Sequence, residues 1–171
     1  FIAAGLAAIA GTLSKMAMDM TVFMSQNFGF ITLKEEMTTG SSIMPHKKNP
    51  DVIELIRARS NRICGVYNDI LMITHNLPSG YHRDFQLLKE ILFPAYNDIF
   101  TCIEMMKVVI KNIEGKENII GDARYKYIFS VENINEKVKE NIPFREAYLQ
   151  VANDIQKGSF RRISGVNYTH T

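Results

Sequence analysis

Three stretches of the chain repeat apolar residues at alternating steps of three and four, which is the spacing of an α-helix that buries one face. The first repeat consists of Ile2, Leu6, Ile9, Leu13, Met16, Met20 and Phe23. The second consists of Ile53, Ile56, Ser60, Ile63, Tyr67 and Ile70. The third consists of Phe85, Leu88, Leu92, Ala95, Ile99, Cys102, Met106, Val109 and Ile113. Such helices bury their apolar faces against one another, so the pattern predicts an all-α fold built on a near-antiparallel bundle of long helices.

Shorter elements follow the third repeat, after a polar run at residues 112–118. We expect residues 1–113 to belong to a central helical bundle that includes a loop at 38–50. Residues 114–171 are expected to form part of a small helical C-terminal domain. Within it the pattern predicts elements at 123–130, 131–139 and 143–157. The last of these has Phe144, Ala147, Tyr148, Val151 and Ile155 on one face.

The first eleven residues are almost wholly apolar, as in a signal peptide or a membrane span. No basic residue precedes them, the polar residues Thr12, Ser14 and Lys15 interrupt the run, and eleven residues are too few to cross a bilayer. We therefore expect no membrane partner. Because the helical repeat begins with no capping residue, we expect the chain to be the later part of a longer protein.

Charge and cysteine content further limit the class of protein and the partners it can have. The net charge is only +2 and the basic residues are scattered, so a nucleic-acid partner is not expected. Cys64 and Cys102 occupy apolar positions of helical patterns, which indicates reduced core residues of a cytoplasmic protein. The cysteines and the four histidines have no metal-ligand spacing, so no metal is expected.

The run Gly40 to Asp51 is the part of the chain that suggests chemistry. It contains small hydroxyl residues and basic residues and ends at a predicted helix start, where Asn49 would be the N-cap and Pro50 the first helical residue. Backbone N–H groups at a helix start together with two lysines favour a bound anion. Gly40 can adopt backbone angles closed to other residues, as a loop that closes over a ligand requires. On these grounds alone a surface linker is the favoured interpretation.

The pattern Ser-Ser-x-Met-Pro-x-Lys-x-Asn in this run resembles the signature of the fumarase/aspartase superfamily, whose members release fumarate from a substituted succinate. The fuller string from Thr39 to Asp51, followed by Leu55-Ile56-Arg57, is most similar to the argininosuccinate lyase family. A second block from Tyr81 to Lys89 fits that family's Tyr-x-x-Asp-x-Gln-x-x-Lys. The family's usual Gln and His are replaced here by His46 and Tyr148.

The resemblance implies a role for each matching residue. Ser41 corresponds to the catalytic serine, and Lys47 and Asn49 to loop residues that engage the substrate or its anionic intermediate. Ser42, Tyr81, Gln86 and Lys89 are assigned to substrate binding. The implied reaction splits argininosuccinate into arginine and fumarate by β-elimination through an aci-carboxylate, without cofactor or metal. The implied assembly is a cytoplasmic homotetramer whose active sites are shared between subunits.

Elementary chemistry agrees with these residue types. Removing a proton beside a carboxylate builds a doubly charged intermediate, so the site must supply hydrogen-bond donors and cations. Other interpretations of the residues remain open: Ser42 has the same hydroxyl as Ser41, Lys48 is interpreted as solvated, and Gln86 and Lys89 on their spacing alone form an ordinary exposed strip.

The sequence therefore leaves three possible functions open. The first is an argininosuccinate lyase, of which this stretch alone would be inactive because the family's catalytic His lies earlier in the chain. The second is another fumarate-releasing lyase, of the adenylosuccinate lyase or fumarase type. The third is a non-catalytic helical assembly module.

Overall fold

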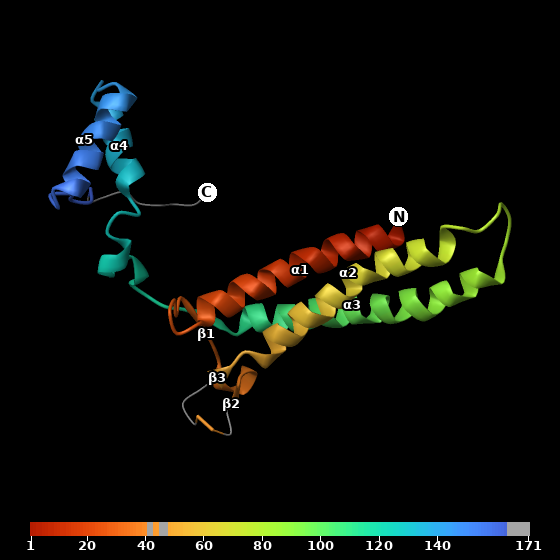
Figure 1. Cartoon of the computed structure of the whole chain (residues 1–171). Coiled ribbons are helices and arrows are strands. Elements are labelled where there is room, and N and C mark those ends of the chain that lie inside the picture. Colours follow the sequence, from red (N-terminus) through yellow and green to blue (C-terminus); the bar gives the residue numbers. More distant parts are fainter. Residues whose placement is uncertain (41–42, 45–47, 164–171) are drawn as a thin grey trace. The chain divides into compact units, whose positions relative to one another are not determined.

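The computed structural model describes residues 1–40, 43–44 and 48–163 (Figure 1). Contacts divide the chain into two compact units, Phe1–Lys116 and Glu117–Thr171, and each is described by itself. The short strand Ile113–Gly115 pairs within the first unit, so the contacts of these residues belong there. The domain boundary expected at residue 113 stays a prediction.

The first unit is a bundle of three long helices, as the apolar repeats predict. Helix α1 covers Ile2–Met24, α2 covers Asp51–Thr74 and α3 covers Leu87–Lys111. Figure 1 shows them side by side, with α2 antiparallel to both α1 and α3. Residues from all three helices meet in two core clusters, one of which includes Ala17, Ile53 and Val109. The expected all-α bundle is confirmed.

The buried face of α1 differs from the predicted one. Ile2 and Ile9 are 69% and 47% exposed, whereas Ala3, Ala10 and Ala17 are buried. Leu6 and Met20 belong to both the predicted and the observed face. A helix face with alanine at the contact lets two backbones approach closely, whereas a pattern of large apolar residues gives no hint of this. The bulky side chains of Ile2 and Ile9 consequently point away from the core.

The faces of α2 and α3 follow the predicted spacing. Along α2 the four predicted residues from Ile53 to Ile63 are buried, and Val66 takes the place expected for Tyr67, which is 41% exposed. Along α3 every predicted residue from Ala95 to Val109 is buried. Each helix therefore presents a continuous apolar face to the others.

Two small antiparallel ladders, which the apolar repeats do not predict, lie at one end of the bundle. Strand β1 (Ile31–Leu33) pairs with β4 (Ile113–Gly115), joining the segment after α1 to the segment after α3. Strand β2 (Thr39–Gly40) pairs with β3 (Lys48–Asn49) directly before α2. Two single 3₁₀ turns, η1 (Glu35–Met37) and η2 (Arg83–Gln86), precede β2 and α3.

In the described part of the second unit, up to residue 163, there are two helices and two 3₁₀ turns. The turns η3 (Ile119–Gly121) and η4 (Ala123–Tyr125) precede α4 (Ser130–Lys139) and α5 (Phe144–Gln156). Its core contains Ile134, Ala147, Val151 and Phe160, with Ile155 packed against it. Phe144 and Tyr148, expected on the buried face of α5, are mostly exposed because a helix this short buries only a narrow stripe.

Among the described residues, one helix has the length and apolar composition to cross a membrane, namely α1. The eleven apolar residues at the start are too few to cross a bilayer, but they belong to a helix of 23 residues, which is long enough. In the structure α1 packs along α2 and α3 through Leu6, Ala10 and Ala17, as a core helix does. Packing within the bundle therefore accounts for these three residues, whereas Ile2 and Ile9 of the same helix are exposed.

Candidate functional site

The signature run has a defined base in the structure. Thr39 pairs with Asn49 and Gly40 with Lys48 in the β2–β3 ladder, so the two ends of the run are held together. The Thr39 hydroxyl also donates a hydrogen bond to the Asp51 carboxylate, in the first turn of α2. The predicted catalytic residues Ser41 and Lys47, and the predicted binding residue Ser42, lie outside the described residues, and their roles stay predictions.

Two details at this base differ from the sequence-based expectation. Helix α2 begins at Asp51 with Pro50 at its N-cap, and the Pro50 carbonyl accepts the Glu54 N–H at 3.1 Å. Asn49 is not the cap because its backbone is engaged in the ladder with Thr39. Gly40 likewise pairs in a strand, and the described glycines with positive φ are Gly29, Gly80 and Gly158. Asn49 therefore does not cap the helix, and Gly40 does not adopt a positive φ in this structure.

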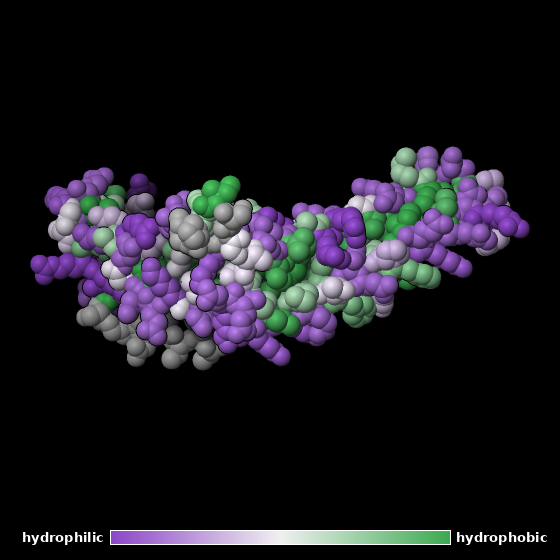
Figure 2. Space-filling view, turned by 90° about the horizontal axis from the view of Figure 1, so that it is seen from below, coloured by the Kyte–Doolittle hydropathy of each residue, from purple (hydrophilic) through white to green (hydrophobic). Residues whose placement is uncertain are grey.

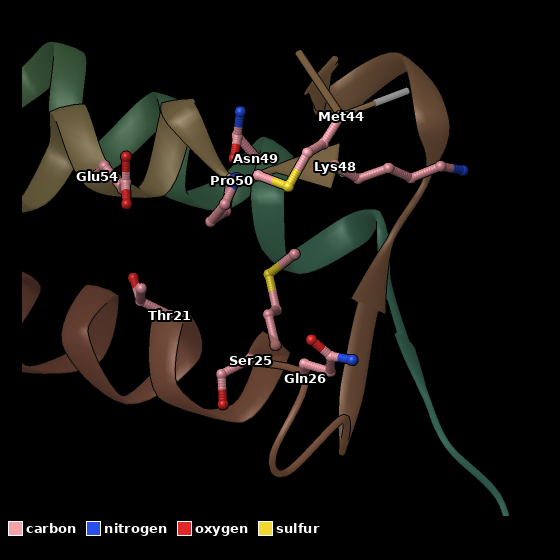
Figure 3. A pocket seen from close by; sticks show the side chains of 9 residues that line it. Thr21, Ser25, Gln26, Met44, Lys48, Asn49, Pro50 and Glu54 are labelled. Carbon is pink, nitrogen blue, oxygen red and sulfur yellow. The ribbon is translucent and has the colours of Figure 1, made fainter. Parts of the chain in front are cut away.

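A pocket of about 640 Å³ lies beside this base (Figure 3). Its walls come from the end of α1, the loop that follows it, the described residues of the signature run with β3, and the start of α2. The lining residues are Thr21, Met24, Ser25, Gln26, Met44, Lys48, Asn49, Pro50 and Glu54. Figure 3 shows Thr21, Ser25 and Gln26 across the pocket from Asn49, Pro50 and Glu54. The pocket is therefore a gap between two antiparallel helix ends.

Polar groups of both kinds line the pocket. The Asn49 and Gln26 amides offer hydrogen-bond donors, and the first N–H groups of α2 have no partner within the helix. These groups suit a carboxylate ligand, while Glu54 places an acidic group on the same wall. The Lys48 ammonium extends away from the pocket and lies 3.4 Å from the Glu35 carboxylate, with both side chains largely exposed. Lys48 is thus mainly solvated, as expected.

Four polar pocket residues were not singled out from the sequence. Thr21, Ser25, Gln26 and Glu54 stand outside the signature string and have no distinctive spacing. The signal that does find them is topological, because in an antiparallel pair the end of the first helix lies beside the start of the second. Once α1 and α2 are paired, residues 21–26 and 49–54 become neighbours.

The three other predicted binding residues lie together at the opposite end of α2. Tyr81 is 76% exposed, with its ring centroid 6.1 Å from that of Phe85. Gln86 ends η2, and Lys89 lies on the first turn of α3, one helical turn further on. Since each helical residue advances about 1.5 Å, the 24 residues of α2 separate its two ends by about 36 Å. One chain therefore does not bring Asn49 and Lys89 to the same small molecule.

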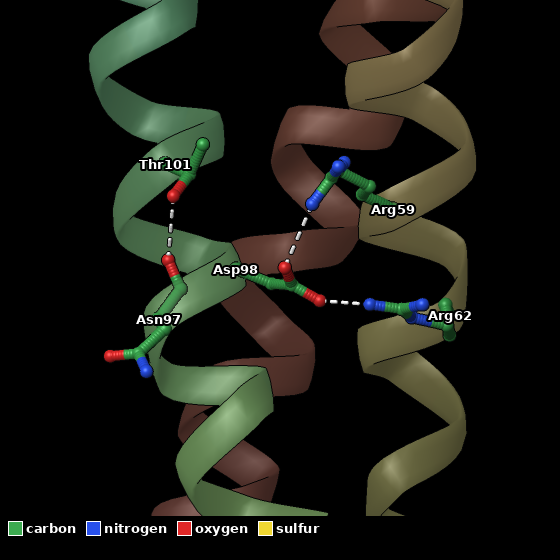
Figure 4. Close-up of polar contacts among 5 residues, drawn as sticks. All are labelled: Arg59, Arg62, Asn97, Asp98 and Thr101. Carbon is green, nitrogen blue, oxygen red and sulfur yellow. Dashed lines mark hydrogen bonds and ion pairs between the residues drawn. The ribbon is translucent and has the colours of Figure 1, made fainter.

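A charged cluster joins α2 and α3 between the two ends (Figure 4). Asp98 contacts both Arg59, at 2.9 Å, and Arg62. The Asp98 side chain is only 16% exposed, whereas both arginines are about half exposed or more. Nearby, burial raises the pKa of the Cys102 thiol, against the opposing effect of Arg59. This cluster has the features of a helix-to-helix contact, not of a reaction site.

Both cysteines are free thiols, in agreement with the expected reduced state. Among the residues that the structure describes, no three His, Cys, Asp or Glu side chains are grouped so as to hold a metal ion. The candidate site therefore consists of the polar pocket with Asn49 at one end of α2 and the Tyr81, Gln86 and Lys89 group at the other.

Comparison with known proteins gives three concordant results. The model of a family described as lyase matches residues 2–65. The argininosuccinate lyases of Phocaeicola vulgatus and Bacteroides fragilis are 51% and 48% identical over 169 residues, which is 99% of this chain and 38% of theirs. That of a Hydrogenobaculum species is 41% identical over 148 residues, covering 86% of this chain and 32% of its own length.

Solved structures share the fold. A variant of EDDS lyase with bound fumarate superposes with a TM-score of 0.73 at 20% identity, covering 91% of this chain and 32% of that one. A 3-carboxy-cis,cis-muconate lactonizing enzyme from Pseudomonas putida gives 0.72 at 17% identity, covering 91% and 36%. At these identities the likeness establishes the helical fold alone.

Sequence similarity places the chain among the lyases of the fumarase/aspartase superfamily. Within that superfamily it is a homologue of the argininosuccinate lyases, and it spans 38% of the length of the Phocaeicola vulgatus and Bacteroides fragilis enzymes.

Proposed function

We propose that the full-length protein carrying this chain splits argininosuccinate into arginine and fumarate. The observation that carries the proposal is the 51% identity to an argininosuccinate lyase, which extends over 99% of the chain. The likeness includes the bundle, the signature run and the second unit. A chance resemblance of one motif would not extend across all three.

In the proposed reaction a base takes the proton from the carbon beside a carboxylate of the succinyl group. The electron pair of the C–H bond moves into that carboxylate and forms an aci-carboxylate. The aci-carboxylate then returns its electron pair to form the C=C bond of fumarate as the C–N bond breaks. The electrons of the C–N bond leave with the guanidino nitrogen, which takes up a proton. The products are fumarate and arginine. Ser41 is proposed as one member of the acid/base pair, a role that is worth about 10²–10⁴ in rate in other enzymes.

Charge develops on the succinyl carboxylate during this reaction, so donors directed at it lower the barrier. Lys47 and Asn49 are proposed to supply them. Asn49 lines the 640 Å³ pocket together with the Gln26 amide and the start of α2. Ser42 is proposed to hold the substrate beside Ser41. No organic cofactor or metal is proposed, because the elimination needs only proton transfer and charge stabilisation.

Each active site is proposed to use more than one copy of the chain. Tyr81, Gln86 and Lys89 are proposed to bind substrate, yet the length of α2 separates them from Asn49 by about 36 Å. A neighbouring antiparallel copy would bring its α2–α3 turn to the pocket of the first copy. A homotetramer built from such pairs is the assembly we propose, with the cytoplasm as its compartment.

Exposed apolar side chains support the assembly. Phe93 and Phe100 on α3 are 63% and 51% exposed, and Leu55 and Met72 on α2 are 58% and 73% exposed. Figure 2 shows hydrophobic residues open to solvent along the molecule. Large apolar side chains left exposed on two helices are in keeping with a subunit interface.

The test is an activity assay of the full-length protein and its Ser41→Ala variant. We expect fumarate release from argininosuccinate, none from adenylosuccinate and no hydration of fumarate, with kcat of the variant at least 10²-fold lower. Residues 1–171 alone are expected to show no turnover. Activity on adenylosuccinate or fumarate instead would assign another lyase of the superfamily. A wild-type protein with no lyase activity that still forms a stable tetramer would favour an assembly module.

A further inference from the structure

The base of the signature run is held by more than its two strand pairs. The Thr39 hydroxyl, on the strand that enters the run, donates to the carboxylate of Asp51, on the helix that leaves it. These residues are twelve positions apart in the sequence. We infer that this bond, here called the Thr39–Asp51 clamp, makes Thr39 and Asp51 positioning residues that fix Asn49 at the pocket wall.

The geometry supports a positioning role because Asn49 lies inside the bonded ring. Its backbone pairs with Thr39, and Asp51 is only two residues further along the chain. Two connections therefore join Thr39 to the same short stretch, one through the ladder and one through the side chains. A hydrogen bond to a charged acceptor is stronger than a neutral one, so the carboxylate suits this function.

A simpler role for Asp51 is to complement the positive end of α2, as an acidic residue in a first helical turn does. That role requires only the charge of Asp51 and leaves Thr39 without a function. Glu54 supplies a second acidic group in the same turn. The clamp is therefore best tested at Thr39, where loss of the hydroxyl leaves both charges in place.

The ion pair between Lys48 and Glu35 is a weaker connection at the same base. Its nitrogen and oxygen are 3.4 Å apart, and the two side chains are 57% and 85% exposed. Solvent and salt screen such a pair, so it adds little to the order of the base. The clamp and the ladder remain the two connections that set where Asn49 lies.

The first experiment measures kcat and KM of the full-length protein with argininosuccinate, and it rests on the proposed function. Thr39→Val removes the donor but keeps the shape, and we expect kcat to fall about ten-fold with KM within about two-fold. Thr39→Ser restores the hydroxyl and is expected to recover most of the activity. Thr38→Val is the matched control, because the Thr38 hydroxyl bonds to the Glu35 carbonyl outside the clamp, and it should leave kcat unchanged.

The second experiment needs no substrate. The Lys48–Asn49 peptide bond lies in the ladder, and trypsin cleaves a chain at such a bond only when it opens. In Thr39→Val we expect cleavage at Lys48–Asn49 to be about ten-fold faster, with Tm unchanged, whereas Thr39→Ser and Thr38→Val should match the wild type. Mass spectrometry of the fragments identifies the site of cleavage.

The two experiments separate the inference from the proposed function. If the wild-type protein is inactive on argininosuccinate while Thr39→Val speeds cleavage, the proposed function fails and the clamp stands. An active wild type with unchanged kcat in Thr39→Val overturns the positioning role, whatever the cleavage rate. A fall in kcat that Thr39→Ser does not restore overturns it as well, because the effect then does not depend on the hydroxyl.

Discussion

The two ends of α2 differ in how their polar residues are held. At the first end Asn49 is fixed by a ladder, lies at a helix start, and borders a pocket that α1 completes. At the second end Tyr81, Gln86 and Lys89 lie in and after a turn, exposed to solvent. The first end is shaped like a binding site, whereas the second has suitable groups on an open surface.

This difference indicates what each end contributes. The first end of α2, here called the enclosed end, can orient a reacting group, because Asn49 is held by the ladder and by the start of the helix. The open end can add contacts only where another surface faces it. In the proposed assembly the two ends therefore act as complementary halves of one site, supplied by different copies of the chain.

The largest effect is expected at the enclosed end. Asn49→Ala in the full-length protein removes one donor from the developing charge, and kcat/KM should fall by about 10²–10³, corresponding to about 2.7–4 kcal/mol. Initial rates of fumarate release measure this. Asn61→Ala is the matched control, since Asn61 lies on α2 and accepts the Ser14 hydroxyl at 2.6 Å, away from the pocket. Equal losses of kcat/KM in both variants would show that Asn49 contributes no more to the reaction than an asparagine remote from the pocket.

A smaller effect, mainly on KM, is expected at the open end. Lys89→Met removes a charged donor and should raise KM about ten-fold or more, because a hydrogen bond to a charged group contributes about 1.5–3 kcal/mol. Lys107→Met is the control, since Lys107 lies on the same helix and pairs with Glu104.

Mixing the two impaired variants sharpens the comparison, with activity measured at an argininosuccinate concentration below KM. Subunits with Asn49→Ala and subunits with Lys89→Met, when unfolded together and refolded, should recover part of the wild-type activity, since some sites then receive two intact halves. No recovery on mixing would place both halves in one subunit and contradict the shared site.

The smallest effect concerns the packing of α1 against α2, the helix that separates the two ends. Ala17 is fully buried where α1 meets α2, so Ala17→Leu should overpack the core and lower the free energy of unfolding by about 1–3 kcal/mol. Denaturant titration of the full-length protein measures the change. Ala8→Leu, on the exposed face of α1, should leave stability nearly unchanged. An equal loss from both variants would place the contact face of α1 elsewhere.

The bundle was predictable because three-four periodicity reflects burial directly. On α2 and α3 the predicted residues from Ile53 to Ile63 and from Ala95 to Val109, most of them large and apolar, are buried. On α1 the periodicity of large residues pointed to Ile2 and Ile9, while the contact is made by Ala3 and Ala10. Small residues carry a weak hydrophobic signal, although they permit the closest approach of two helices.

The candidate site was predictable only in part. Similarity to a known family indicated Asn49, and the structure places it at a pocket wall. The helix-capping role expected for Asn49 was wrong, because a pairing partner ten residues away, Thr39, engages its backbone. The pocket residue Thr21 comes from another helix and Gln26 from the loop after that helix, and no local pattern encodes such neighbours. Long-range pairing is the information that a single pass along the chain lacks.

The β1–β4 ladder has one more consequence. Its pairing from Ile31 to Leu33 is extended by two hydrogen bonds, from the Lys34 N–H to the Asn112 carbonyl and from the Lys116 N–H to the Phe30 carbonyl. The segments that follow α1 and α3 are therefore hydrogen-bonded to each other. The opposite end of the bundle, at residues 75–86, is a turn outside any such ladder. Thermal fraying should therefore start there, and amide exchange in the last turn of α2 should outpace exchange at Lys34, whose N–H donates to the Asn112 carbonyl.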